Sequence, residues 1–343
     1  MQKIERVKLK SGLEVYFLTD PKFVNTSIQM AFKVGWKQDP EHLLGLAHLF
    51  EHLVGKRTKK YPGKSEFAEV LYKQGIISNA YTSPDLTVYY QNQLPENLYV
   101  SLELFLEALY DTNFTEEDLE KEKSVVSTEA RMYLDNDDKQ IYRQVLKNLF
   151  PQTSLEKFLF GTNETLDNIT LEVFEDFYKF YKNPANGILF VASPKNEKAK
   201  VVKYLNDFYS KKGSQFLEKK VFPKHEKEVL GKIVPKVKLD KPSLTQAKIC
   251  TAYRISRLNT RERVVFGVLR SILLDGLTAK LYKKLRDDLG LIYSMGLFYD
   301  FHIPNQDFIA FKTATDKKEV NKVLLETVNV LDEVLTSITQ DNV

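Results

Sequence analysis

Two histidines and a glutamate lie close together in the segment Gly45-Leu-Ala-His-Leu-Phe-Glu-His-Leu53. An α-helix advances about 100° per residue, so His48, Glu51 and His52 would fall on one helix face. Leucine and phenylalanine side chains fall on the opposite face, which is the pattern of a helix anchored in a core. Two imidazoles at positions i and i+4 can bind one metal ion, with the carboxylate beside them. The segment therefore predicts a helix that carries a metal-binding pair.

The order His-x-x-Glu-His is the inverted form of a zinc-peptidase signature, in which the histidines bind zinc and the glutamate activates the attacking water. A surface helix that carries these residues by chance is the alternative interpretation. Histidine is scarce, with five residues in the whole chain, so chance spacing explains the pattern poorly. A catalytic zinc site normally takes three protein ligands and leaves one position open, so a third ligand is expected elsewhere.

The candidate for this third ligand lies in a helix predicted from Thr115 to about Tyr133. Thr115 suits the N-cap position, and acidic residues fill the first turn. Glu122, Val126 and Glu129 share one face of this helix. Two carboxylates on an inward face need a partner, because an unpaired buried charge is costly. A metal ion with an outer carboxylate would satisfy both glutamates, whereas a solvated acidic helix is the alternative.

Composition restricts the class of protein. The chain has 343 residues, of which 43% are hydrophobic and 28% charged, as in soluble globular proteins. No apolar run is long enough for a membrane span, and the N-terminus opens directly into a strand pattern. A cytoplasmic location is the simplest expectation, although a chain that had lost its leader would look the same. The net charge of +4 is evenly spread, which argues against a nucleic-acid partner, and the single Cys250 rules out an internal disulfide.

The order of elements predicts an α+β fold of two similar domains, each an antiparallel-type sheet backed by helices. We expect a metal-binding domain over residues 1–210, a connector over 211–245 and a second domain over 246–343. In the first half, strands are predicted at 4–9, 13–18, 27–34, 76–83, 86–94 and 187–192, and helices within 45–53 and at 65–74, 95–111, 115–133, 139–149, 171–181 and 197–209. In the second half, strands are predicted at 246–254, 291–299 and 308–313, and helices at 261–275, 278–289 and 317–338.

Taken together, these motifs resemble the zinc-peptidase family of pitrilysin, insulin-degrading enzyme and mitochondrial processing peptidase. In that family a Glu-x6-Glu pair follows the inverted motif, and here Glu122 and Glu129 match it at a similar distance along the chain. The resemblance implies that His48, His52 and Glu129 are zinc ligands. It also implies that Glu122 is an outer acid that orients a ligand or the water.

Two further segments resemble parts of the family's substrate site. Asn79-Ala-Tyr-Thr82 resembles the strand to which the peptide adds as an extra strand, which implies that Asn79, Ala80 and Thr82 contact substrate. An ordinary edge strand is the alternative. Arg286 and Tyr293 resemble the family's arginine and tyrosine, which donate hydrogen bonds to a peptide carbonyl and to the developing oxyanion. An amphipathic helix followed by a strand with a cross-strand aromatic residue is the alternative there.

The resemblance implies a zinc metalloendopeptidase that cleaves peptides or unfolded segments, with Glu51 as general base. Its two domains would form one half of a clamshell, completed by a second copy or by a second homologous subunit. A non-catalytic partner or scaffold subunit is the alternative function. Manganese or cobalt could also occupy a site with two histidines and a glutamate. The last domain ends earlier than family modules usually do, as in a compact member or a piece of a longer polypeptide.

Overall fold

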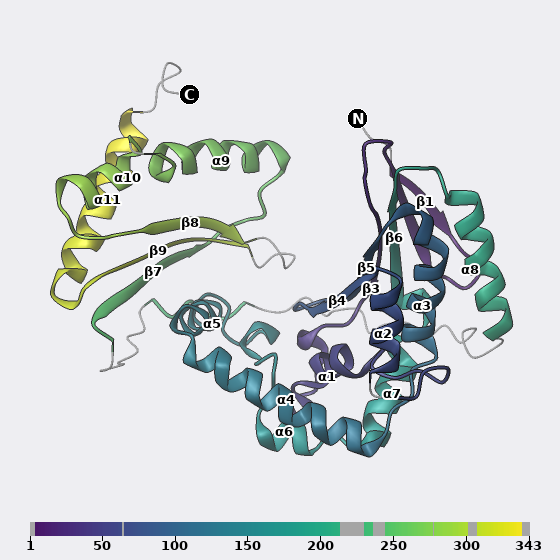
Figure 1. Cartoon of the computed structure of the whole chain (residues 1–343). Helices are drawn as coiled ribbons and strands as arrows, with labels where there is room; N and C mark the ends of the chain where they lie inside the picture. The colour runs from purple at the N-terminus through teal and green to yellow at the C-terminus, as the bar shows by residue number, and fades with distance from the viewer. Residues whose placement is uncertain are drawn as a thin grey trace. The chain divides into compact units, whose positions relative to one another are not determined.

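The computed structural model describes residues 4–63, 65–212, 230–235, 244–276, 278–300 and 307–337. The chain divides into two compact units (Figure 1). The first unit comprises Met1–Asn136 and Lys157–Glu228, and the second comprises Asp137–Glu156 and Val229–Val343. Among the helices that the structure describes, none combines the length and the apolar composition of a membrane-spanning segment.

A six-stranded sheet forms the centre of the first unit, in the order β1-β2-β6-β3-β5-β4. Its strands are β1 (Ile4–Lys8), β2 (Glu14–Thr19), β3 (Thr26–Phe32), β4 (Ile77–Thr82), β5 (Thr87–Gln93) and β6 (Gly187–Ser193). The pairings are antiparallel except that β6 runs parallel to β2, so the sheet is mixed. A parallel pair needs a long crossover connection, and the chain between β2 and β6 is long enough to contain β3, β4, β5 and several helices.

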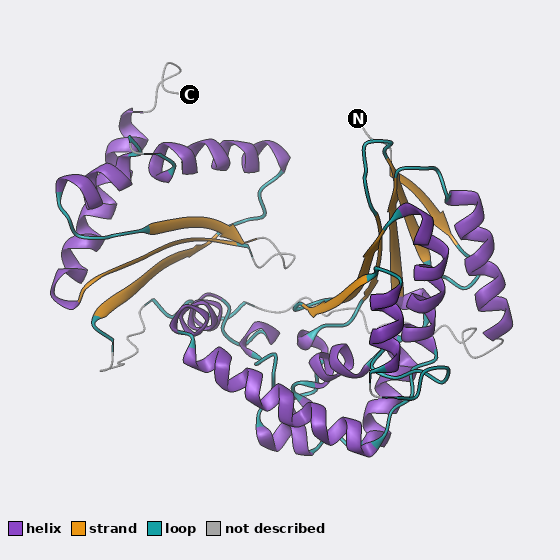
Figure 2. Ribbon diagram, viewed as in Figure 1, coloured by secondary structure: helices purple, strands orange, loops and turns teal. Residues whose placement is uncertain are grey.

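Figure 2 shows helices beside the sheet of the first unit. Most of these helices share one hydrophobic core with the sheet, whereas the helix over Glu66–Lys73 packs in a smaller cluster with Leu104 and Ala108. Phe32 of β3, Phe50, Phe105 and Phe174 are among the largest fully buried side chains of the shared core. The α-helices are α1 (Leu46–Leu53), α2 (Glu66–Lys73), α3 (Leu98–Tyr110), α4 (Glu116–Asp135), α6 (Asn163–Asp167), α7 (Leu171–Tyr181) and α8 (Lys198–Lys212). Short 3₁₀ turns lie at η1 (Trp36–Gln38), η2 (Glu41–Leu43), η3 (Pro95–Asn97) and η5 (Pro184–Asn186).

The second unit has its own antiparallel sheet, in the order β7-β9-β8, and its own core. Its strands are β7 (Gln246–Arg254), β8 (Met295–Asp300) and β9 (Phe308–Asp316). Its helical elements are α5 (Asp137–Leu149), η4 (Ser154–Glu156), α9 (Thr260–Leu274), α10 (Lys280–Tyr282), η7 (Lys283–Asp288), η8 (Lys317–Glu319) and α11 (Val320–Ser337). A sheet with helices in each unit agrees with the predicted α+β class.

Helix α5 belongs to the second unit, although the sequence placed it inside the first domain. Asp138 of α5 pairs with Lys248 of β7 at 2.9 Å and with Lys312 of β9 at 3.1 Å. Tyr142 donates a hydrogen bond to Asp300 at 2.6 Å. These contacts join residues far apart along the chain, so local periodicity does not reveal them. Within the expected connector, residues 213–229 and 236–243 lie outside the described residues.

Strand β8 begins at Met295, four residues later than the predicted 291–299 strand. The residues before it are held by side chains of β9 instead. Thr313 Oγ1 donates to the Ser294 carbonyl at 2.8 Å, and Thr315 Oγ1 donates to the Leu291 carbonyl at 2.6 Å. Threonine hydroxyls thus satisfy carbonyls that a longer strand would pair through its backbone.

Candidate metal centre

Helix α1 is held at its N-terminus by Asp39. The Asp39 carboxylate accepts hydrogen bonds from the Gly45 and Ala47 N–H groups, both at 3.0 Å. Free N–H groups at a helix start attract such an acceptor. Burial raises the pKa of Asp39 to about 8, against the opposing effect of these hydrogen bonds. Gly45 adopts φ of +98°, and a Cβ there would come within 2.8 Å of the Phe160 carbonyl oxygen, so this turn requires glycine.

Helix α4 packs against α1 and presents both predicted carboxylates to it. Thr115 caps α4 by accepting from the Asp118 N–H at 3.1 Å, as the sequence predicted. Leu119, Glu122 and Val126 are buried on the same face. Because this face is anchored by apolar side chains, Glu129, one turn further along, is directed at the two histidines.

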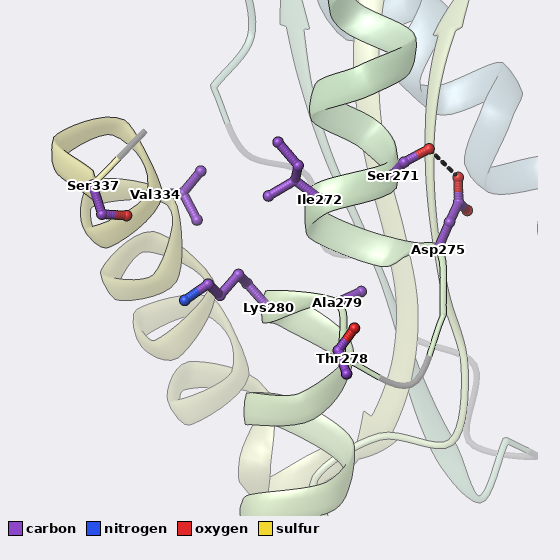
Figure 3. A pocket seen from close by; sticks show the side chains of 8 residues that line it. All are labelled: Ser271, Ile272, Asp275, Thr278, Ala279, Lys280, Val334 and Ser337. Atoms are coloured by element: carbon purple, nitrogen blue, oxygen red, sulfur yellow. Dashed lines mark hydrogen bonds between the residues drawn. The ribbon is translucent and has the colours of Figure 1, made fainter. Parts of the chain in front are cut away.

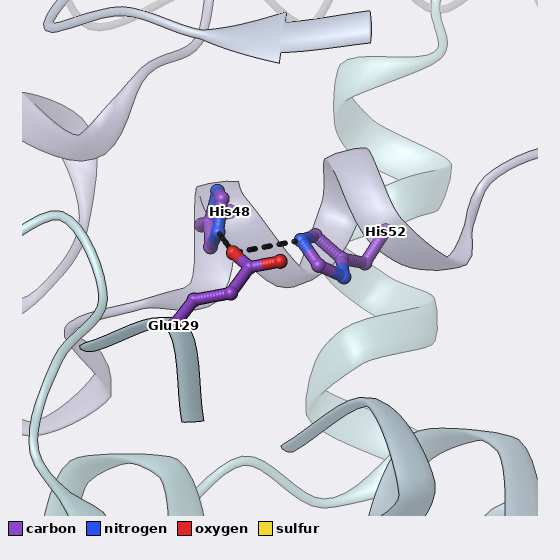
Figure 4. Close-up of side chains that lie close together, drawn as sticks. All are labelled: His48, His52 and Glu129. Carbon is purple, nitrogen blue, oxygen red and sulfur yellow. Dashed lines mark hydrogen bonds and ion pairs between the residues drawn. The ribbon is translucent and has the colours of Figure 1, made fainter. Parts of the chain in front are cut away.

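His48, His52 and Glu129 converge on one point (Figure 4). One ligand atom from each lies within 4.8 Å of the other two. Nε2 of His48 is 3.1 Å from Glu129 Oε2, and Nε2 of His52 is 3.6 Å from the same oxygen. Two imidazole nitrogens and a carboxylate oxygen form a donor set found in catalytic zinc sites. The three side chains therefore fit a zinc ion.

Glu51 lies beside this group on the same helix. Thr82 Oγ1 donates a hydrogen bond to Glu51 Oε2 at 2.6 Å, and His48 Nδ1 lies 3.3 Å from that oxygen. Burial raises the pKa of Glu51, but the contacts with His48 and Thr82 outweigh it and leave the pKa below its usual value. Burial lowers the pKa of His48, and its contacts with Glu51 and Glu129 reverse that effect and raise the pKa. Glu51 is therefore held as a carboxylate, the form that accepts protons.

Glu122 occupies the far side of His52. Its Oε2 lies 3.1 Å from His52 Nδ1, and its Oε1 accepts a hydrogen bond from Lys56 Nζ. Burial raises the pKa of Glu122, but the contacts with His52 and Lys56 outweigh burial and leave the pKa below its usual value. Glu122 thus contacts His52 from outside the group of three possible ligands, and its role as an outer acid stays a prediction. Sequence reasoning did not single out Lys56 or Asp39, because neither belongs to a spaced motif.

The predicted substrate strand is β4, which lies at the edge of the six-stranded sheet. Within the described residues it pairs only with β5, so its outer backbone groups face no strand there. Asn79 is exposed, and Ala80 packs against the core. Thr82 points to Glu51 instead of to the open edge. The structure thus gives Thr82 a partner within the site.

Arg286 and Tyr293 lie together in the second unit, whereas the other predicted residues lie in the first. The Arg286 guanidinium carbon is 5.0 Å from the centre of the Tyr293 ring and 4.7 Å from that of Tyr282. The side chain of Tyr293 is prominently exposed, with 78% of its surface accessible. The Arg286 guanidinium therefore lies against two tyrosine rings in cation–π contacts, and the role of this pair stays a prediction.

A separate cavity of about 330 Å³ lies in the second unit, between α9, α10 and the end of α11 (Figure 3). Ser271 Oγ donates a hydrogen bond to Asp275 across one side of it, at 2.9 Å. The lining residues are Ser271, Ile272, Asp275, Thr278, Ala279, Lys280, Val334 and Ser337. They include no residue predicted from the sequence to act in the site.

In a comparison with known proteins, each half of the chain matches a protein-family model. Residues 15–163 match the family model described as Insulinase (Peptidase family M16), and residues 168–343 match the one described as Peptidase M16 inactive domain. An uncharacterized zinc protease of Rickettsia bellii is 27% identical over 91% of this chain and 74% of its own length. A putative zinc protease of Schizosaccharomyces pombe, mug138, is 36% identical over 51% of this chain but only 18% of its own length.

Solved structures show the same fold. A protease from Helicobacter pylori aligns with a TM-score of 0.82 at 23% identity, over 100% of this chain and 82% of its own. Pitrilysin aligns with a TM-score of 0.75 at 20% identity, over 99% of this chain and 37% of its own. The second family model alone covers half of the sequence. The chain therefore belongs to the insulinase family, peptidase family M16.

Proposed function

We propose that the chain is a zinc metallopeptidase that hydrolyses peptides or unfolded segments. The observation that carries this proposal is the convergence of His48, His52 and Glu129, with the Glu51 carboxylate one turn along the same helix. Zinc bound by these three residues would polarise the scissile carbonyl and make the attacking water more acidic. Relatives named zinc proteases support the same metal and the same reaction class.

The chain's own groups would handle substrate and protons. The open edge of β4 would receive the peptide as an additional strand, with main-chain hydrogen bonds around Asn79 and Ala80. Glu51 would take a proton from the attacking water and return it to the leaving amine. Arg286 and Tyr293 would donate hydrogen bonds to the substrate carbonyl and the oxyanion. We propose that they act within a pair of modules, formed by two copies or with a second homologous subunit.

Metal content tests the site without any assumption about substrate. Elemental mass spectrometry should find about one zinc per wild-type chain and a loss of zinc in Glu129→Gln, because a three-ligand site loses a charged donor. No zinc in the reconstituted wild type would refute the metal assignment.

Hydrolysis is tested separately with Glu51→Gln and a peptide library. This variant should keep its zinc and lose cleavage, because the amide cannot accept the proton. Cleavage that survives unchanged in Glu51→Gln would remove Glu51 from the mechanism. A zinc-bound wild type that cleaves no peptide, alone or mixed with a homologous subunit, would favour a scaffold role.

A further inference from the structure

Lys56 makes a contact that connects a solvent-accessible cation to the metal site. It lies just past the end of α1, and its N–H donates to the Leu53 carbonyl at 3.3 Å. Its Nζ donates to Glu122 Oε1, while the other oxygen of Glu122 lies 3.1 Å from His52 Nδ1. The side chain of Lys56 is 46% exposed, whereas that of Glu122 is 2% exposed. Lys56 thus supplies positive charge to a carboxylate that water barely reaches.

The two oxygens of Glu122 have different partners, and this division fixes the carboxylate. A buried carboxylate is costly unless it is paired and hydrogen-bonded. With Oε1 held by the ammonium group, Oε2 stays directed at His52. An ionised carboxylate only accepts hydrogen bonds, so Glu122 suits a His52 that donates from Nδ1 and binds a metal through Nε2. That Nε2 is the atom that faces Glu129, at 3.6 Å.

We infer that Lys56 is a positioning residue of the metal site, which holds Glu122 in the orientation that directs His52 Nε2 toward the metal. The inference rests on the proposed zinc site and concerns neither substrate nor the reacting atoms. Outer partners of this kind typically change metal affinity by about 10- to 100-fold when they are removed. Lys56 therefore acts on how tightly the site holds its metal.

The test compares Lys56→Met with Lys56→Arg in the full chain. Zinc affinity is measured by competition with a chromogenic chelator, and the melting temperature of the metal-free protein is measured alongside. Lys56→Met should bind zinc about 10- to 100-fold more weakly, since it keeps the length of the side chain and removes its charge. Lys56→Arg should restore most of the affinity. The metal-free melting temperature should fall in Lys56→Met and recover in Lys56→Arg, because the buried Glu122 carboxylate loses and then regains a charged partner.

Lys60→Met is the matched control. Lys60 is another exposed lysine of the same loop, 3.4 Å from Glu103, so its loss should leave zinc affinity unchanged. Wild-type affinity in Lys56→Met would overturn the inference while the zinc site stands. A loss that Arg does not recover, together with a lower metal-free melting temperature, would also overturn it, since the role would then be structural. A wild type that binds no zinc would instead refute the proposed function, and this inference with it.

Discussion

Glu51 Oε2 is held by two neighbours of different origin, the hydroxyl of Thr82 on strand β4 and the imidazole of His48 on its own helix. The Thr82 contact joins the edge of the sheet to the proposed base. A hydrogen bond to a charged group contributes about 1.5–3 kcal/mol, enough to select one orientation of the carboxylate. Thr82 is therefore better placed to orient Glu51 than to contact substrate.

Replacing Thr82 with valine should lower kcat by about 10- to 100-fold, because the same shape is kept while the orienting hydroxyl is lost. KM and zinc content should change little, and Thr82→Ser should recover most of the turnover. Steady-state kinetics on a cleaved peptide measure kcat and KM separately. A raised KM with normal kcat would indicate instead that Thr82 contacts substrate.

Lys182, directly after α7, should make the stability of the first unit depend on pH at a position away from the metal site. Burial, together with Lys212, Lys59 and Lys179, lowers the pKa of Lys182 to about 8 despite the nearby Asp111. The unfolded chain, with a pKa near 10.5, then binds more protons between pH 8 and 10.5, so this group makes stability rise with pH in that window.

Lys182→Met should therefore melt at a higher temperature than the wild type at pH 7, and the difference should shrink as the pH approaches 10.5. Methionine keeps apolar contact with the Tyr178 ring, which lies 4.2 Å from Lys182 Nζ. Thermal melts of both metal-free proteins across this range measure the difference. A difference in melting temperature that stays constant with pH would show that Lys182 keeps its ordinary pKa in the folded protein.

At the scale of elements, α1 is an eight-residue helix that carries both histidines and the proposed base. A helix of this length is not stable by itself in water, so its order comes from packing and capping. Leu49 and Phe50 anchor it in the core, and Asp39 satisfies the N–H groups at its start. The geometry of the site therefore depends on a cap outside the motif.

Asp39→Ala should destabilise the first unit by about 1–3 kcal/mol, because the Gly45 and Ala47 N–H groups would lose their acceptor in buried surroundings. Asp39→Asn keeps one acceptor oxygen and should fall between the alanine variant and the wild type. Chemical denaturation of the metal-free proteins measures the free energy of unfolding of the wild type and of both variants. Equal stability of all three would show that the helix start is satisfied in another way.

At the scale of the whole molecule, all three proposed zinc ligands come from the first unit, so metal binding should stabilise that unit in particular. Ligand at 1,000 times its Kd adds about 4 kcal/mol to the state that binds it. In calorimetry, zinc should raise a transition that EDTA lowers again, and Glu129→Gln should show no such shift. A transition equally raised in Glu129→Gln would place the bound zinc elsewhere.

The sequence by itself indicated most of the elements and the set of candidate ligands. The period of an α-helix is a local property of the backbone, so the shared face of His48, Glu51 and His52, and that of Glu122 and Glu129, could be predicted from spacing alone. The α+β class followed from the alternation of strand and helix patterns. Spacing could not predict that the faces of these two helices meet. Only the resemblance to a family indicated that Glu129 lies near the two histidines.

Only the tertiary structure decided which side chains meet across the site. Lys56 contacts Glu122, and Thr82 contacts Glu51, although each pair is far apart along the chain. Asp39, which precedes α1, accepts a hydrogen bond from the Gly45 N–H at the start of that helix. The parallel insertion of β6 beside β2 and the place of α5 in the second unit are of the same kind. Such contacts arise from packing between elements, for which no periodicity exists along the chain. The sequence therefore indicated the ligands, and the fold supplied the residues that hold them in place.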